Sequence, residues 1–144
     1  MCTTCERTVK PSTWPGESLP NDNEGARAAT VVWVVLVAVY VATLAPDVTL
    51  WDAGEFNAAI ATLGIPHPPG TPLYVLIGRV WSRLFGFVPQ ALAVNALSAF
   101  ATATGCALLA RVVARWTDRL AGIAAGLTAG LTFSLWQNAT ETEV

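Results

Sequence analysis

Apolar and polar residues alternate in long blocks along the chain. Residues 1–27 are polar, 28–45 are uncharged and rich in Val and Leu, and 46–87 mix acidic, proline-rich and amphipathic sequence. Uncharged sequence returns over 88–110 and, after an arginine-rich connector, over 120–137. Because a helix rises about 1.5 Å per residue, each uncharged block nearly spans or exceeds a bilayer core of about 30 Å. The pattern predicts an all-α integral membrane protein with transmembrane helices at 28–45, 88–110 and 120–137.

The ends of the chain's apolar blocks indicate its orientation. Residues 1–27 are too polar to bury a core of their own, so we expect a disordered tail. Basic residues gather in this tail and in the connector after the second span: Arg7, Lys10, Arg27, Arg111, Arg115 and Arg119. The positive-inside rule places both regions in the cytoplasm. The loop 46–87 is then extracytoplasmic, and a bias toward Ala, Val and Arg favours the bacterial inner membrane over a eukaryotic membrane.

Composition and cysteine content agree with a membrane protein. Hydrophobic residues make up 53% of the 144 residues and charged residues 12%, which excludes an ordinary soluble domain. The net charge of -2 is uninformative in total. We expect membrane lipid as a partner and no nucleic acid. Cys2 and Cys5 would supply half of a zinc site, but no second pair follows, so two reduced cysteines are favoured. Cys106 lies in an apolar span, and we expect it to be buried.

Two acidic residues mark the start of a short helix in the outer loop. Asp52 and Glu55 are three positions apart, and apolar residues recur behind them with helical spacing, so 53–63 is predicted as an amphipathic helix ended by Gly64. Spacing alone favours a capping arrangement, in which the acids satisfy free N–H groups. Paired carboxylates beside a membrane can also act as a general base or hold a divalent cation against a phosphate. The two roles are compatible.

A proline cluster and a second amphipathic helix follow. Four prolines between residues 66 and 72 forbid a helix before Thr71, which suits an N-cap. The helix so started, over 72–85, has an apolar face and a side carrying Arg79 and Arg83, which is typical of a helix lying in the membrane interface with arginines toward headgroups. Either arginine could also bind the phosphate of a lipid-linked sugar. His67, the chain's single histidine, is fixed between prolines and is a weaker candidate for the same site.

Small and polar residues within the later spans predict helix packing. Gly122, Gly126 and Gly130 are spaced by four residues, which lets another helix approach closely. Asn95 and Ser98 lie on one face of the second span, together with Thr102, and suit hydrogen bonding inside a bundle. These features indicate structure rather than chemistry.

Three runs of the sequence resemble a known family. Residues 43–46 read T-L-A-P, residues 51–56 read W-D-A-G-E-F, and residues 63–74 read L-G-I-P-H-P-P-G-T-P-L-Y. The succession resembles the N-terminus of the transmembrane protein O-mannosyltransferase family, in the GT-C superfamily, whose signature has Ser at position 53 and Tyr at position 71. The resemblance extends to Glu143 and Val144, and covers about residues 40 to 144.

The resemblance implies a fold and a reaction. The fold would be the N-terminal part, over 28–144, of a multi-spanning GT-C bundle with short interfacial helices in its first outer loop. The enzyme would transfer a sugar from a polyprenyl-phosphate donor to a protein or glycan hydroxyl, with Asp52 as base and Glu55 beside it. His67, Arg79, Arg83 and Glu143 become substrate-binding candidates. No organic cofactor is implied, and a divalent cation stays open.

Other functions also fit the residues taken alone. A transporter or lipid-binding scaffold could use the acids for a cation and the arginines for a headgroup. A structural membrane subunit could use the acids only as helix caps. Because GT-C enzymes have many more spans, we expect this chain by itself to be inactive.

Overall fold

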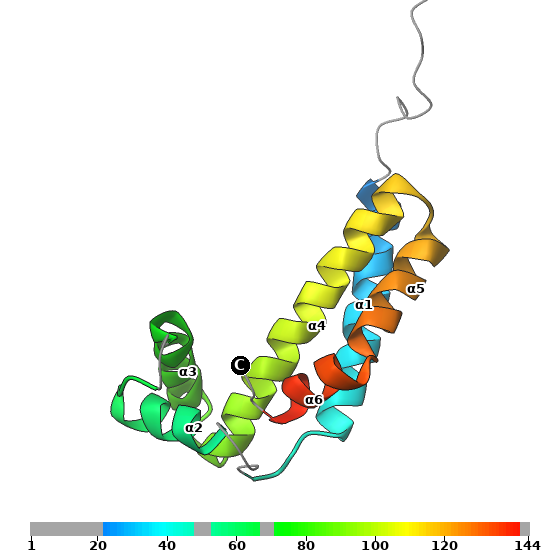
Figure 1. Ribbon diagram of the computed structural model, residues 1–144. Helices are drawn as coiled ribbons and strands as arrows, with labels where there is room; N and C mark the ends of the chain where they lie inside the picture. Colours follow the sequence, from blue (N-terminus) through cyan, green and yellow to red (C-terminus); the bar gives the residue numbers. More distant parts are fainter. Residues whose placement is uncertain (1–21, 48–52, 67–70, 142–144) are drawn as a thin grey trace, which may run out of the picture.

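The computed structural model describes residues 22–47, 53–66 and 71–141, and these form helices joined by short turns and loops (Figure 1). The helices are α1 (Asp22–Ala42), α2 (Ala53–Thr62), α3 (Pro72–Leu84), α4 (Gln90–Trp116), α5 (Arg119–Gly130) and α6 (Phe133–Glu141). Within these ranges no strand occurs. Both α1 and α4 are long and apolar enough to cross a membrane. The prediction of an all-α membrane fold is confirmed.

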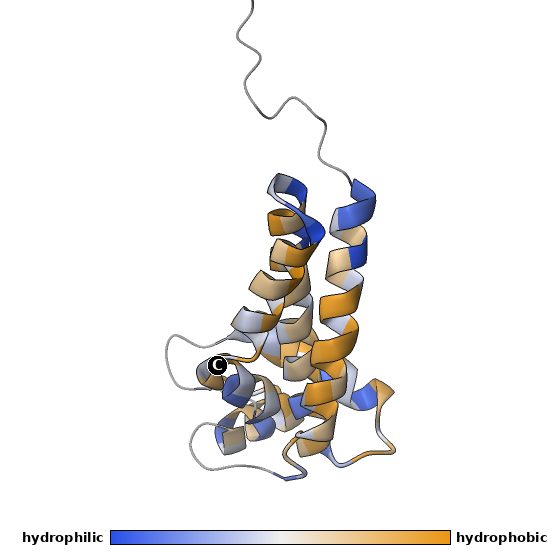
Figure 2. Ribbon diagram, turned by 90° about the vertical axis from the view of Figure 1, so that its right-hand side faces the viewer, coloured by the Kyte–Doolittle hydropathy of each residue, from blue (hydrophilic) through white to orange (hydrophobic). Residues whose placement is uncertain are grey.

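The helices α1, α4 and α5 pack side by side as an upright bundle, and small residues make this possible. A Cβ atom added at Gly122 would lie 2.6 Å from the carbonyl oxygen of Ala110, and one at Gly126 would lie 2.9 Å from Cγ1 of Val32. The backbone of α5 therefore touches both α4 and α1. The predicted close approach at these glycines is confirmed, and the apolar bodies of the helices stand out in Figure 2.

The third apolar block, predicted as one helix over 120–137, is two helices that meet at a 64° bend. The buried hydroxyl of Tyr40 donates a 2.7 Å hydrogen bond to the carbonyl of Gly130, the last residue of α5. In an uninterrupted helix that carbonyl would accept from the N–H of Ser134. Two residues after this carbonyl, the hydroxyl of Thr132 donates to the carbonyl of Ala129 at 2.7 Å. A side chain from α1 thus ends α5 at a point where the sequence contains no proline.

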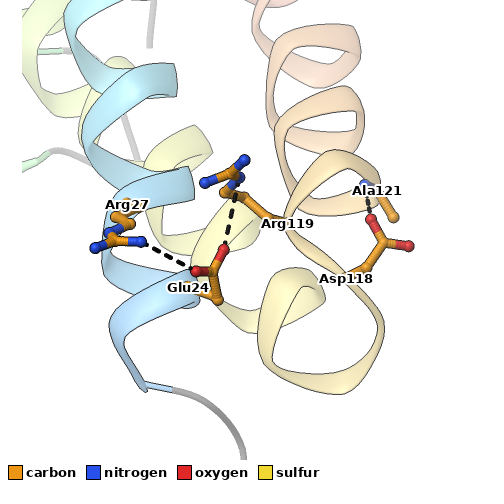
Figure 3. Close-up of polar contacts among 5 residues, drawn as sticks. All are labelled: Glu24, Arg27, Asp118, Arg119 and Ala121. Atoms are coloured by element: carbon orange, nitrogen blue, oxygen red, sulfur yellow. Dashed lines mark hydrogen bonds and ion pairs between the residues drawn. The ribbon is translucent and has the colours of Figure 1, made fainter.

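The end of the bundle opposite α2 and α3 is charged. Asp22 lies 3.4 Å from Arg115 of α4, and Glu24 lies 3.2 Å from Arg27 and 3.5 Å from Arg119 (Figure 3). These contacts involve the first turns of α1, which begins at Asp22. Residues 22–27 are therefore helical, although the sequence predicted them to be part of a disordered tail. Residues 1–21, the rest of that predicted tail with Cys2 and Cys5, lie outside the described residues.

At this charged end α4 continues through Trp116, so only Thr117 and Asp118 separate it from α5. Asp118 caps α5 by accepting a 2.9 Å hydrogen bond from the N–H of Ala121 (Figure 3). The arginine-rich segment predicted as a connector is therefore mostly helix. Cys106, on α4, is buried as expected.

Candidate functional site

The loop between α1 and α4 carries α2 and α3, which pack against each other and against the first half of α4 (Figure 1). The ring of Phe56 meets the ring of Tyr74 edge to face at 5.8 Å. Ile60 is fully buried and packs against Gly78. A Cβ atom added at Gly78 would lie 2.6 Å from Cδ1 of Ile60. A side chain at residue 78 would require Ile60 or the helices to shift, so this glycine permits the close packing of Ile60 on α3.

The end of α2 departs from the predicted geometry. We expected Gly64 to end the helix, but Leu63 holds the left-handed conformation, with φ of 57°. The N–H of Gly64 then donates to the carbonyl of Ala59 at 2.9 Å. This is the Schellman arrangement with a leucine at the position that usually holds glycine. Leu63 bears the conformational strain, of about 1 kcal/mol, that glycine would avoid.

Hydrogen bonds at the start of α4 tie three separate segments together. The side chain of Gln90 donates to the carbonyl of Asn57 in α2 at 2.7 Å. The side chain of Asn95 donates to the carbonyl of Ala45, just after α1, at 3.0 Å. The N–H of Ala45 in turn donates to the carbonyl of Thr140 in α6 at 3.3 Å. The first turns of α4 therefore hold the beginning of the outer loop, the acid-bearing helix α2 and the end of α6 at one end of the bundle.

The structure describes Glu55, Arg79 and Arg83 among the predicted site residues. Glu55 is exposed in the first turn of α2, and Arg83 is exposed in the last turn of α3. Asp52, His67 and Glu143 lie outside the described residues. The capping role of Asp52 therefore stays a prediction, as does any distance from Asp52 to Glu55.

The side chain of Arg79 extends to the last turn of α2. Its Nη1 atom donates to the carbonyl of Ala61 at 2.8 Å and approaches the carbonyl of Ile60 at 3.5 Å. These carbonyls belong to the last turn of α2, where helix carbonyls lack partners within the helix and carry partial negative charge. The guanidinium is thus directed at the C-terminus of α2, a contact that the sequence did not predict. The residue is partly buried, and its Nε atom is buried.

Replacing Arg79 should therefore destabilise the packing of α2 on α3. Arg79→Met keeps an apolar stem but leaves the Ala61 carbonyl without its donor, a loss of about 1–3 kcal/mol. We expect a lower midpoint in a thermal unfolding scan of the purified full-length protein. Arg83→Met removes the same charge from an exposed position one turn later and should change the midpoint little. Equal midpoints for the two variants would contradict the role given to Arg79.

A pocket of about 380 Å³ opens between the end of α2 and the start of α3. Its lining is mostly apolar, and the residues include Leu63, Ile65, Pro66, Pro72, Val75 and Leu76. Thr71 also lines it, and its buried hydroxyl has no hydrogen-bond partner among the described residues. Thr71 precedes α3 as predicted, with Pro72 at the first helical position, but its side chain makes no capping hydrogen bond.

The described parts of the site contain hydrogen-bonding and apolar groups rather than a metal-binding cluster. Across 22–47, 53–66 and 71–141, no three His, Cys, Asp or Glu side chains gather closely enough to hold a metal ion. Asn57 and Gln90 were missed by the sequence analysis, although both are polar residues in otherwise apolar helices. Asn95 was expected to make hydrogen bonds within a bundle, and its partner is the backbone of the outer loop.

Comparison with known proteins relates the chain to membrane glycosyltransferases. The family model described as the N-terminal domain of protein O-mannosyl-transferase TMEM260 matches residues 52–144. The chain is 34% identical over 96 residues to protein O-mannosyl-transferase TMEM260 of Mus musculus, an alignment covering 67% of this chain and 14% of that protein. It is 32% identical over 63 residues to protein O-mannosyl-transferase tmem260 of Dictyostelium discoideum, covering 40% of this chain and 8% of that protein. The chain thus corresponds to a small part of the length of these relatives. No solved structure matches it.

Proposed function

Since this chain belongs to the family of protein O-mannosyl-transferase TMEM260 N-terminal domains, we propose that it supplies catalytic residues to a membrane mannosyltransferase. The donor is a polyprenyl-phosphate mannose, and the acceptor is a hydroxyl group on a protein or glycan. In this proposal residues 28–144 form the N-terminal part of a GT-C membrane domain. The loop between α1 and α4 lies on the extracytoplasmic side, because Arg27, Arg111, Arg115 and Arg119 all gather at the other end of the bundle.

Asp52 acts as the general base in this proposal. Its carboxylate accepts the proton of the acceptor hydroxyl while the hydroxyl oxygen bonds to the anomeric carbon of mannose. The bond from that carbon to the phosphate oxygen breaks, and the polyprenyl phosphate leaves with the electron pair. Positioned proton transfer of this kind contributes about 10²-fold to 10⁴-fold to a rate. Glu55, one helical turn further along, orients the acceptor or the catalytic carboxylate.

Arg83, His67 and Glu143 are proposed to contact the donor. An arginine can bind a phosphate through two parallel hydrogen bonds, and Arg83 is exposed in the last turn of α3. Arg79 is the weaker candidate of the two, because its Nη1 atom is already bonded to the end of α2. Donor binding by Arg83 thus needs no rearrangement of the hydrogen bonds described above.

The observation that carries the proposal is the family match that begins at Asp52 itself and continues through the end of α6. The hydrogen bonds from Gln90 to Asn57 and from Asn95 to Ala45 support it, because they hold the acid-bearing helix and the loop beside α4. A base needs this kind of support from a fixed scaffold. A bacterial inner membrane location is proposed on composition alone.

A donor assay on the full-length protein in liposomes tests the function. We expect mannose to be transferred to acceptor protein from polyprenyl-phosphate mannose, and not from a nucleotide-linked mannose supplied in the same vesicles. Mass spectrometry of the acceptor before and after mild β-elimination locates the sugar on a hydroxyl. Saturable binding of the polyprenyl-phosphate sugar with no turnover would favour a lipid-binding scaffold instead.

A further inference from the structure

One face of α3 is covered with large aliphatic side chains that the described part of the chain leaves exposed. Leu73 and Leu84 are each 69% exposed and Val80 is 62% exposed, with Leu76 and Ile77 between them. Leu76 joins the pocket near Thr71 to a shallower groove of about 300 Å³ that extends toward Leu84. A continuous apolar face of this kind is unfavourable in water and indicates contact with lipid or protein.

Four polar side chains of α3 are hydrogen-bonded to α2, to α4 or within α3, and Arg83 is exposed. Arg79 is bonded to the end of α2, and the Tyr74 hydroxyl lies 2.9 Å from Oγ of Ser98 on α4. The indole N–H of Trp81 donates to the carbonyl of Ala93 at 2.8 Å. The hydroxyl of Ser82 donates to its own helix, to the carbonyl of Gly78. Polar groups must be paired in this way where water is absent, as in a bilayer core.

The contacts between α3 and α4 indicate how deep each end of α3 lies in the bilayer. Trp81 contacts Ala93 while Tyr74 contacts Ser98, so α3 runs back along the first half of α4 in the opposite direction (Figure 1). Residues 91–110 of α4 are uncharged, and as a helix they rise about 30 Å, the thickness of a bilayer core. With the boundary of the bilayer core placed at Gln90, Ser98 lies about 12 Å below it along the axis of α4. The N-terminal end of α3 therefore lies deeper in the bilayer than its C-terminal end.

The composition of the face distinguishes lipid from another helix. Where helices of this chain pack closely, as α5 does on α4, glycines and alanines form the interface. The exposed face of α3 carries Leu, Ile and Val and no small residue, which does not suit close helix packing in a membrane. At its shallow end lie the exposed Arg83 and a cluster of rings, with Trp81 and Phe85 centred 4.6 Å apart. Arginine and aromatic residues are typical of the membrane–water interface.

We propose that α3 is inserted at an incline into the lipid leaflet on the side of the outer loop, with its aliphatic face against acyl chains and Leu73 deeper than Leu84. This differs from a helix lying flat in the interface, in which the two residues would share one depth. Insertion would anchor the loop that carries Glu55 at a fixed height relative to the bilayer. The proposal does not depend on sugar transfer.

Fluorescence quenching in liposomes tests both the contact and the incline. Single cysteines at Leu73, Val80 and Leu84, in a full-length protein lacking other reactive cysteines, are labelled with a small environment-sensitive fluorophore. Lipids with a doxyl group at either a shallow or a deep acyl carbon serve as quenchers, and iodide serves as the aqueous one. Leu108→Cys, exposed in the second half of α4, is the lipid-facing control, and Thr117→Cys, in the turn after α4, is the aqueous control.

The expected result is loss of fluorescence with doxyl lipids at all three positions and little loss with iodide. The ratio of deep to shallow quenching should fall from residue 73 to residue 84. Equal ratios along the helix would overturn the incline. Quenching by iodide to the extent seen at residue 117, or protection from both quenchers as expected beneath another protein segment, would overturn the lipid contact.

Discussion

Asp52→Asn in the full-length protein is expected to lower mannose transfer by about 10²-fold to 10⁴-fold, because the amide cannot accept the acceptor proton. The change keeps the size of the side chain and its ability to cap a helix, since asparagine is as good an N-cap as aspartate. Protein yield and the thermal unfolding midpoint should therefore match those of the unaltered protein. Initial rates with polyprenyl-phosphate mannose, at saturating acceptor, provide the measurement.

Two further variants separate catalysis from capping. Asp52→Ser preserves a good N-cap and removes the carboxylate, so it should be as inactive as Asp52→Asn if the residue is a base. Full activity of the serine variant would leave capping as its role and refute the proposed mechanism. Asp47→Asn removes a carboxylate earlier in the same loop, outside the matched region, and should retain transfer.

Gly126→Leu should prevent α5 from docking on α1 and α4. A Cβ atom at this position would lie 2.8 Å from the Cβ of Ala110 and 2.9 Å from Cγ1 of Val32. The remaining atoms of leucine have no space there, so overpacking should destabilise the bundle by about 1–3 kcal/mol or force α5 away. We expect a sharp loss of monodisperse protein in detergent size-exclusion chromatography and a lower unfolding midpoint.

Gly105→Leu is the matched control for this variant. Gly105 is exposed on α4, and a Cβ added there meets nothing within 4 Å. The same substitution then adds apolar surface without a clash, and glycine-to-leucine replacement favours the helix itself. If both variants behave alike, the close approach of α5 is not what Gly126 provides.

Much of the fold follows from local sequence. Uncharged segments of sufficient length predicted α1 and α4, and Pro72 fixed the first helical position of α3. The glycine spacing of α5 predicted close packing, because only a residue without a side chain permits it. These properties depend on hydropathy, backbone geometry and residue size, all of which are local.

The candidate site was only partly visible in this way. The paired acids, the proline segment and the arginines were identified from the sequence, and the family match covers all of them. The contacts of these residues could not be predicted from the sequence, because Arg79 could equally face headgroups, a phosphate or a neighbouring helix. The choice depends on where the end of α2 lies, and helical periodicity within α3 contains no information about that position.

The amino-acid sequence alone predicts that this chain forms helices and enters a membrane, because segments of about 20 apolar residues are stable in lipid as helices. The packing of the helices fixes where they bend and what their polar groups bind. Tyr40 ends α5 by bonding to Gly130, 90 positions away, and Asn95 fixes the outer loop through the carbonyl of Ala45. Most buried hydroxyls and amides in proteins are hydrogen-bonded, and only the packed helices determine which carbonyl is within reach.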